Sequence, residues 1–453
     1  MSDPVRRRVR TLGVECGQPG GVLAGVDDAL QMASRTLGVL VPQLDALKID
    51  GCPLADVNGQ AFDGLAGLRQ LRVQSRPHGA DWPPAGAALT LAADVFDGQL
   101  AQLHVLDLAL NELRLLPPSL CRLRSLQHLN VTGNRLQVRS DPVALAQLVW
   151  NESGTRAVCV RVCVLQDLNW LVPTDETETC LSELRVLDAS YNRLTALHAG
   201  VLHRLQRLQQ LHLQGNWLVQ VADNALDGLV SLRLLNVAGN QLTSLPPALL
   251  AQTRQLQVRS RLCLSVSVCV CVCACSGLTV GRGVRPLQEL YASANSLAVL
   301  APGLLHGLDD LLVIDLSDNQ LTSASLSGSQ QTLHGLRHLA VLSLHNNRIQ
   351  RLDAALLQDL TALQILRLDG NLIEALPDGL LDGLAALHTL ILSRNRLTAL
   401  QAGAVAGLQR LALLALDNNL LERVDDQALA NCTALRDLNL SGNYLAQVRR
   451  HST

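Results

Sequence analysis

Two kinds of residue are scarce in this 453-residue chain. Aromatic residues make up only 2% of it, although 48% of all residues are hydrophobic. Leucine must therefore fill the core positions that phenylalanine and valine share in ordinary domains. Lysine occurs only at Lys48, and the formal net charge is −2. This balance gives no reason to expect binding to nucleic acid or to an anionic membrane.

Familiar catalytic motifs are also missing from the sequence. The patterns GxxxxGK[ST], HExxH and GxSxG do not occur. The stretch Gly17–Gly25 is rich in glycine, but it does not follow a predicted strand, as a phosphate-binding loop would. The sequence therefore predicts neither an enzyme nor a bound cofactor.

One leucine pattern dominates the chain. The frame LxxLxLxxN/CxL occurs fourteen times between Leu44 and Leu445, with Arg76 in place of Asn or Cys in the second frame, and for most of that length it recurs every 24 residues. A fixed period of this length is typical of a solenoid, in which each unit buries its apolar edge only against its neighbours. A protein built this way is expected to bind partners rather than to catalyse a reaction.

The spacing within the frame predicts the local structure. Leucines at positions four and six share one face of a short strand, and the residue between them points the other way. The asparagine at position nine is expected to turn inward and pair buried backbone groups. The fold class is thus an α/β solenoid, a leucine-rich-repeat horseshoe with a concave parallel β-sheet and a mostly irregular convex side. Cys52 takes the ladder position in the first frame, and the ladder asparagines are Asn111, Asn134, Asn192, Asn216, Asn240, Asn295, Asn319, Asn347, Asn371, Asn395, Asn419 and Asn443.

The period is interrupted at several places within the repeat array, which we assign to residues 44–446. Residues 74–100 are expected to form a surface loop, residues 138–183 a loop or insert, and residues 258–288 an insert. One repeat is four residues longer than the 24-residue period, and its extra residues are expected to form a surface loop through 323–331, which a solenoid tolerates easily. Residues 1–43 are expected to be irregular and to lack a proper cap, and residues 447–453 form a tail.

The insert at 258–288 contains the run LCLSVSVCVCVCACSGLTVG at residues 262–281, which admits three interpretations. Its length and low charge are typical of a membrane span, and its CxC spacing is typical of a soft-metal site. The third interpretation is a retained intron, because removing 31 residues restores the 24-residue period. We favour the intron, since the frame continues in phase on both sides, and predict that the whole segment lies outside the sheet.

The cysteines outside these runs are few. Cys121 lies one repeat before the insert that contains Cys159 and Cys180, so a disulfide that tethers the insert is one expectation in an oxidising compartment. A small buried hydrophobic side chain is the alternative for Cys121, and the favoured one for Cys432.

The sequence gives conflicting indications of the cellular compartment. The first sixteen residues contain no apolar stretch long enough for a signal peptide, and the chain as written contains no favoured membrane span. Candidate N-glycosylation sites nevertheless occur at Asn130, Asn151, Asn431 and Asn439, which is compatible with secretion. The lack of polar end caps suggests a fragment of a longer protein.

Residues between the strand leucines are expected to line the concave face, where a protein ligand or receptor partner would bind. Among these residues, the candidate contacts are Asp107, Asp188, His212, Tyr291, Asp315 and Arg367. For any single one of them, an ordinary solvated surface residue is the favoured alternative.

The irregular stretches resemble those of a known family. The stretches at 44–54, 119–137, 242–257, 387–397 and 429–443, together with the Trp82-Pro83 loop, are similar to the long Toll receptors of arthropods, the eighteen-wheeler group. The resemblance implies a leucine-rich-repeat ectodomain at the extracellular face of the plasma membrane. It also implies the ligand-binding part of a transmembrane signalling receptor; a secreted Slit-type protein and an intracellular repeat scaffold are the alternatives.

Overall fold

A computed structural model describes residues 10–15, 43–51, 54, 56–74, 89–97, 100–136, 180–250, 287–326, 332–405, 407–425, 427–430 and 432–445. The chain forms two compact units. Unit 1 comprises residues 1–218 and 225–229, and unit 2 comprises residues 219–224 and 230–453.

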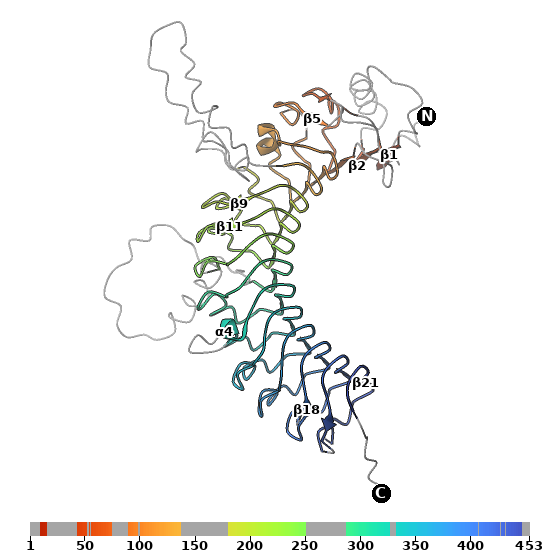
Figure 1. The fold of residues 1–453 in the computed structure, drawn as a ribbon. Coiled ribbons are helices and arrows are strands. Elements are labelled where there is room, and N and C mark those ends of the chain that lie inside the picture. Colours follow the sequence, from red (N-terminus) through yellow and green to blue (C-terminus); the bar gives the residue numbers. More distant parts are fainter. Residues whose placement is uncertain are drawn as a thin grey trace, which may run out of the picture. The chain divides into compact units, whose positions relative to one another are not determined.

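Unit 1 is built around a parallel sheet whose strands follow one another in chain order (Figure 1). A second, two-stranded sheet pairs β3 (Asp56–Val57) with β5 (Thr90–Leu91). Later turns contain the 3-10 helix η1 (Pro118–Arg122) and the short strand β9 (Ala196–Leu197). The strands of the main sheet in this unit are β1 (Thr11–Glu15), β2 (Ala46–Asp50), β4 (Gln70–Gln74), β6 (Val105–Asp107), β7 (His128–Asn130), β8 (Val186–Asp188) and β10 (Gln210–His212).

Unit 2 repeats the same arrangement. Outside the main sheet it contains β11 (Gln220–Val221), the short helix α4 (Ser323–Leu326), and the paired strands β18 (Ala399–Leu400) and β20 (Arg423–Val424). Its main strands are β12 (Leu234–Asn236), β13 (Glu289–Tyr291), β14 (Val313–Asp315), β15 (Val341–Ser343), β16 (Ile365–Arg367), β17 (Thr389–Ile391), β19 (Leu413–Ala415) and β21 (Asp437–Asn439). The predicted parallel-sheet solenoid with little helix is therefore confirmed.

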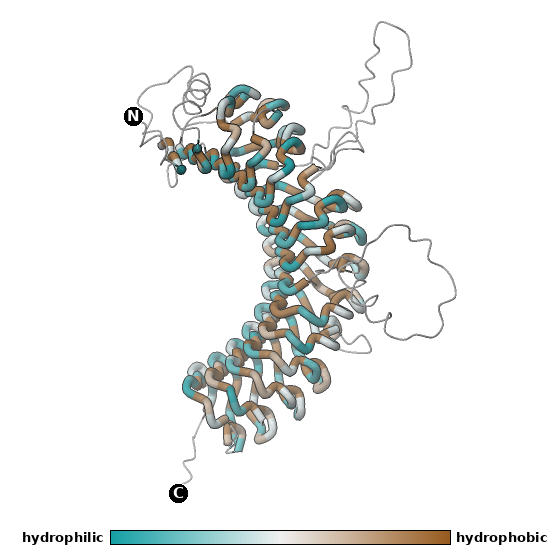
Figure 2. The backbone as a smooth tube through the Cα atoms, turned by 180° about the vertical axis from the view of Figure 1, so that it is seen from behind, coloured by the Kyte–Doolittle hydropathy of each residue, from teal (hydrophilic) through white to brown (hydrophobic). Residues whose placement is uncertain are grey.

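The core of each unit is a stack of leucines. In β16, Leu366 is fully buried, and Leu368 beyond the strand is buried too, whereas Ile365 and Arg367 are only half-buried. Figure 2 shows the apolar segments recurring from turn to turn. This alternation follows from the two-residue period of a strand, and each buried leucine contributes roughly 1.5–3 kcal/mol to folding.

The asparagine ladder connects each turn to the preceding one. Asn371 donates from Nδ2 to the carbonyl oxygen of Leu368 in its own turn, at 3.0 Å, and to that of Leu344 in the preceding turn, at 2.9 Å. Its Oδ1 accepts the backbone N–H of Ile349, also in the preceding turn, at 3.1 Å. One buried side chain thus pairs three backbone groups that would otherwise be buried without partners.

The ladder continues across both long interruptions of the period. Leu136 donates its N–H to Asn192, and Leu242 donates to Asn295, although these partners are 56 and 53 residues apart in sequence. The frames on either side of each insert therefore stack as direct neighbours, which the phase of the sequence had predicted for the insert at 258–288.

The C-terminal edge of the 258–288 insert differs from the sequence prediction. Leu287 is fully buried, and Gln288 donates its N–H to the carbonyl oxygen of Arg233, so the end of the 258–288 segment belongs to the repeat. The dipeptide Leu-Gln occurs at both 256–257 and 287–288, and the structure uses the second copy to enter β13. Both residues precede β13, so the difference is that they pack into the repeat rather than belonging to the insert. Residues 258–286, including the run 262–281, lie outside the described residues, and their predicted place outside the sheet stays a prediction.

Three other segments are more ordered than the sequence indicated. Strand β1 lies within the stretch expected to be irregular, and it pairs in register with β2. Within 74–100, the side chains of Leu89 and Phe96 are buried, so this part packs against the core rather than forming a surface loop. In the four-residue insertion after β14, the hydroxyl of Ser325 donates a hydrogen bond to the carbonyl oxygen of Ala298 at 2.7 Å, which anchors α4.

Replacing a ladder residue should destabilise the fold strongly. We expect Asn371→Ala to lower the free energy of unfolding by about 1–3 kcal/mol, because it leaves buried backbone groups unpaired. The exposed Arg396 lies in the next turn, and Arg396→Ala should change this free energy by less than about 0.5 kcal/mol. Denaturant unfolding of the two variants would measure the difference, and equal shifts would show that the inward and outward positions are misassigned.

Candidate binding surface

The outward residues of the main strands form one continuous row in each unit, which we call the sheet face. Parallel pairing aligns them strand by strand, about 4.8 Å apart. In unit 1 this row is Lys48, Arg72, Asp107, Asn130, Asp188 and His212. In unit 2 it is Asn236, Tyr291, Asp315, Ser343, Arg367, Ile391, Ala415 and Asn439. All six residues predicted to contact a ligand therefore lie on the sheet face, three in each unit.

Opposite charges alternate at the start of the sheet face in unit 1. Arg72 places its Nε 3.4 Å from Oδ1 of Asp50 and 3.7 Å from Oδ2 of Asp107, and Lys48 lies 2.5 Å from the other oxygen of Asp50. These contacts orient the guanidinium across neighbouring strands, so this end of the face is already neutralised by its own residues.

A second charged cluster joins Arg367 on the sheet face of unit 2 to the turns that follow β16 and β17. The side chain of Asp369 is only 5% exposed, and two arginines flank it: Arg367 at 3.3 Å and Arg394 at 3.1 Å. One buried carboxylate thus holds two cations at the surface, and the cluster retains an excess positive charge. An arrangement of this kind suits a carboxylate on a protein partner, because the arginine fork binds carboxylates in a bidentate geometry.

Two aspartates of the sheet face have the same local geometry. Oδ1 of Asp315 accepts the backbone N–H of Ser317 at 3.1 Å and its hydroxyl at 2.6 Å. Oδ1 of Asp188 accepts the same two groups of Ser190 at 3.0 and 2.5 Å. In each case one carboxylate oxygen is fixed toward the end of the strand.

Tyr291 is the aromatic residue of the sheet face in unit 2. Its hydroxyl donates a hydrogen bond to Oε2 of Glu289 at 3.0 Å. Partial burial raises the pKa of the Tyr291 phenol, and the hydrogen bond to Glu289 and the negative charges of Glu289 and Asp315 raise it further. The phenol therefore remains neutral, and a hydrogen-bond donor, at any physiological pH.

The titration of Tyr291 gives a test of this geometry. Because its pKa is raised on folding, the stabilising contribution is complete below the ordinary value near 10 and is lost as pH rises through the folded value. Ultraviolet titration of the folded protein should show a phenol ionising above the ordinary range. Glu289→Gln should bring this ionisation back toward the ordinary value, and an unchanged titration would refute the contact.

Exposed aromatic side chains gather at the turns that follow β8 and β10. Tyr191 is 62% exposed and Trp217 is 49% exposed, and the guanidinium of Arg193 lies 5.6 Å from the centre of the Trp217 ring. Tyr191 lies directly over Gly215, where an added Cβ would come within 2.5 Å of its ring. Tryptophan, tyrosine and arginine are the residues most enriched at the centres of protein interfaces, so this turn edge of unit 1 is a second candidate contact surface.

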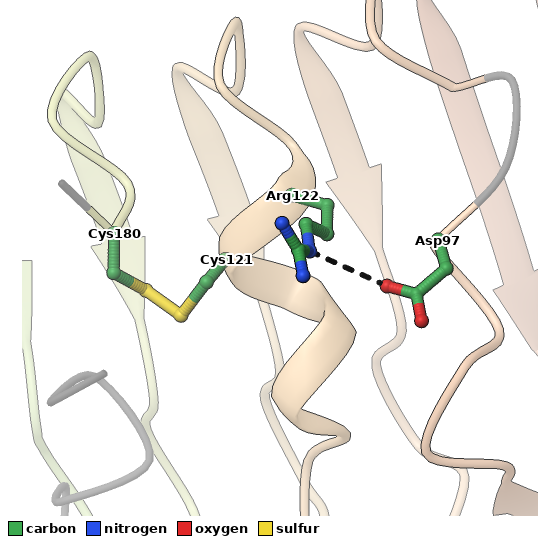
Figure 3. Close-up of a disulfide and its surroundings, with 4 residues drawn as sticks. All are labelled: Asp97, Cys121, Arg122 and Cys180. Carbon is green, nitrogen blue, oxygen red and sulfur yellow. Dashed lines mark ion pairs between the residues drawn. A yellow bond between two sulfur atoms is a disulfide. The ribbon is translucent and has the colours of Figure 1, made fainter. Parts of the chain in front are cut away.

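A disulfide lies away from the sheet face of unit 1. Cys121 in η1 is bonded to Cys180, so the disulfide alternative of the sequence analysis is confirmed, with Cys180 as the partner (Figure 3). Beside it, Arg122 pairs with Asp97 at 3.6 Å. Cys432 is a buried free thiol, as predicted, and burial raises its pKa.

Removing the disulfide should destabilise unit 1. The two cysteines are 59 residues apart, and closing a loop of about that length stabilises a fold by roughly 4 kcal/mol in the chain-entropy model. We expect Cys121→Ser with Cys180→Ser to lower the thermal midpoint of unfolding markedly. Cys432→Ser, which removes a buried thiol without opening a loop, serves as the control, and a larger loss in that variant would contradict the assignment.

The remaining predicted residues are distributed as follows. Asn130 and Asn439 lie on the sheet face, whereas Asn151 and Asn431 lie outside the described residues. The sequence analysis missed Asp369 and Arg394, although extending the strand alternation by two residues beyond Arg367 would have placed Asp369 on the same face. Within the described ranges, no three His, Cys, Asp or Glu side chains converge as a metal site, and no helix is long and apolar enough to cross a membrane.

The fold and its charged sheet face define a repeat solenoid with an extended surface for binding. The leucine-rich-repeat family profile matches residues 87–136, 182–242, 326–373, 337–396 and 385–445, which together exceed half of the chain. The protein belongs to the leucine-rich-repeat family, whose members are generally modules for protein interaction rather than enzymes.

Several relatives come from animals. The chain is 35% identical to Toll-like receptor 7 of Drosophila melanogaster over 231 residues, which is 48% of this chain and 14% of that receptor. It is 27% identical to mouse Podocan over 339 residues, or 70% of this chain and 50% of Podocan. The chain therefore spans only part of the relatives it matches.

Solved structures show the same fold. A leucine-rich-repeat protein of Leptospira interrogans matches with a TM-score of 0.67 and 22% identity, over 98% of this chain and 87% of that one. The Drosophila Toll–Spatzle complex matches with a TM-score of 0.64 and 16% identity, over 96% of this chain and 50% of that one. These structures show that the chain shares the leucine-rich-repeat fold.

Proposed function

We propose that this chain is part of the extracellular ligand-binding region of a Toll-like transmembrane receptor, and that a protein ligand docks on the sheet face of unit 2. The observation that carries the proposal is the cluster in which buried Asp369 holds Arg367 and Arg394 at the surface, two strands from Asp315. This arrangement presents fixed charges of both signs on one rigid sheet.

Two further observations support the extracellular part of the proposal. The disulfide between Cys121 and Cys180 requires an oxidising compartment to persist. Toll-like receptor 7 of Drosophila melanogaster is 35% identical to this chain over 231 residues, and the Drosophila Toll–Spatzle complex shares its fold.

The energetics favour a protein ligand. Eight strands at about 4.8 Å give the sheet face of unit 2 a length of roughly 35 Å, enough to bury the roughly 800 Å² per partner of a standard interface. Fixed charges on such a surface select partners and speed their encounter. A rigid sheet also loses little conformational freedom on binding.

Charge reversal tests the docking surface. The secreted chain would first be screened against a library of secreted and cell-surface proteins. For a partner found in this way, Asp315→Lys with Arg367→Glu should weaken binding about tenfold or more, since close interfacial charge pairs contribute roughly 1.5 kcal/mol or more. The milder pair Asp315→Asn and Arg367→Gln should weaken binding less, and thermal melts would check that each variant is folded.

A matched control lies outside the sheet face. Arg337 and Asp378 are exposed, and their reversal changes the same charges without altering the sheet face. Binding lost in this control but kept in the Asp315 and Arg367 variants would overturn the docking surface. Loss only on mutation of Tyr191 or Trp217 would move the site to the turn edge of unit 1.

The receptor assignment has its own test. Sequencing the complete transcript should reveal a signal peptide, a membrane helix and a cytoplasmic signalling domain. A stop codon after a cysteine-rich cap would instead support a secreted Slit-type protein, and a transcript with neither signal peptide nor membrane helix would support an intracellular scaffold.

A further inference from the structure

Asn130 occupies the middle of the sheet face in unit 1. It ends β7, with Leu129 and Val131 on either side pointing into the core. Asp107 on one neighbouring strand and Asp188 on the other are its direct partners in register. Its side chain therefore projects from the sheet between two carboxylates.

The amide of Asn130 is oriented by one hydrogen bond. Its Oδ1 accepts the backbone N–H of Thr132 at 3.0 Å, which leaves Nδ2 directed away from the strand end. None of the hydrogen bonds found among the described residues uses this nitrogen. Nδ2 is the atom that receives the sugar in N-linked glycosylation.

Thr132 completes the acceptor sequence Asn-Val-Thr. Its hydroxyl lies 3.3 Å from that of Ser190, whose own proton is donated to Asp188. Thr132 is therefore the donor to Ser190, and the hydroxyl that the glycosylation sequence requires also connects β7 to β8 in the folded protein.

Asn236 provides an internal comparison. It holds the corresponding position at the end of β12, and its Oδ1 accepts the backbone N–H of Ala238 at 3.0 Å, the same bond that Asn130 makes with Thr132. Ala238 has no hydroxyl, so Asn236 lacks the acceptor sequence. The two asparagines thus share one geometry and differ in the one feature that glycosylation requires.

We propose that Asn130 carries an N-linked glycan that covers the sheet face of unit 1 around β6, β7 and β8. A glycan is bulky and hydrated, and the neighbouring strands are only about 4.8 Å away. Asp107 and Asp188 are then excluded as contacts of a protein ligand. The proposal rests on the extracellular function proposed above, because the sugar is added in the secretory pathway.

The same reasoning applies at the end of unit 2. Asn439 in β21 is exposed, and its Oδ1 accepts both the backbone N–H and the hydroxyl of Ser441, at 3.1 and 2.8 Å. With the same reach of one strand, a second glycan there covers β19 and β21 and leaves β12 to β17 as the uncovered stretch of the sheet face in unit 2. This stretch contains Tyr291, Asp315 and Arg367, so on the sheet face of unit 2 the glycan leaves the proposed docking residues open.

Glycopeptide mass spectrometry tests occupancy. The full chain would be secreted from insect cells behind a heterologous signal peptide, so that every acceptor sequence meets the glycosylation machinery. We expect a glycan on Asn130 that is lost in Thr132→Ala. We also expect Ala238→Thr to add a glycan to Asn236, which is bare in the unaltered chain. An unmodified Asn130 in the secreted, folded protein overturns the proposal.

Chemical labelling of carboxylates tests whether the glycan covers the face. Asp188 and Asp315 have matched hydrogen bonds, so they should react alike with a carbodiimide and glycine ethyl ester when both are uncovered. In the glycosylated protein the labelling of Asp188 relative to Asp315 should be low, and in Asn130→Gln it should rise several-fold. An unchanged ratio shows that the glycan leaves the face open and refutes the covering.

Neither measurement requires a binding partner. If the glycan covers Asp188 but no partner depends on Asp315 and Arg367, the docking surface of the proposed function fails and the glycan assignment stands. If a partner binds at Asp315 and Arg367 while Asn130 is bare, the proposed function stands and the glycan assignment fails.

Discussion

The buried amide of the ladder asparagine is the interaction on which the rest of the structure depends. A three-residue strand cannot pair the backbone groups of the turn that follows it, and burial of those groups without partners costs roughly 1–3 kcal/mol each. A side chain such as Asn371 supplies one acceptor and two donor contacts at that point. Because these groups are satisfied internally, the turn can pack tightly, and the leucines can stack without gaps between neighbouring repeats.

The rigidity produced by this ladder gives the outward residues fixed positions. Ligand contacts on a loop would have to be ordered during binding, at a cost in conformational entropy, whereas Arg367 and Arg394 are already held by Asp369. The same scaffold presents Asn130 between Asp107 and Asp188. The same repeated backbone thus carries a charged cluster suited to a protein partner and an asparagine suited to a glycan. Which of the two a strand carries depends on the single residues at its outward positions.

Much of the fold could be predicted because leucine spacing alone determines the frame. All fourteen frames from Leu44 onward form strands of the main sheet, and every ladder asparagine named from the sequence is only slightly exposed except Asn443. Strand β1 could not be predicted, because TLGVE lacks the leucine frame and is defined only by its pairing with β2.

The charged clusters were equally inaccessible to sequence reasoning, since they depend on side chains brought together from different turns. Arg394 meets Asp369 across 25 residues. The frame did not decide between the two Leu-Gln dipeptides at 256–257 and 287–288, because both fit it, and the packing of Leu287 shows that the second copy enters β13. The frame predicts which residues face outward, but their partners on neighbouring turns are set by the structure.

The ladder also has a direction. A ladder asparagine such as Asn395 binds Leu392 in its own turn, and Leu368 and the N–H of Ile373 in the turn before it. A turn therefore relies on its successor for part of its hydrogen bonding, much as subunits do in a polar filament. If a turn is duplicated, the asparagine of the new turn bonds the backbone of the turn before it. The backbone of the new turn is in the same way bonded by the asparagine of the turn after it. Chains of this kind can therefore lengthen or shorten by whole turns during evolution without any change to the remaining ones.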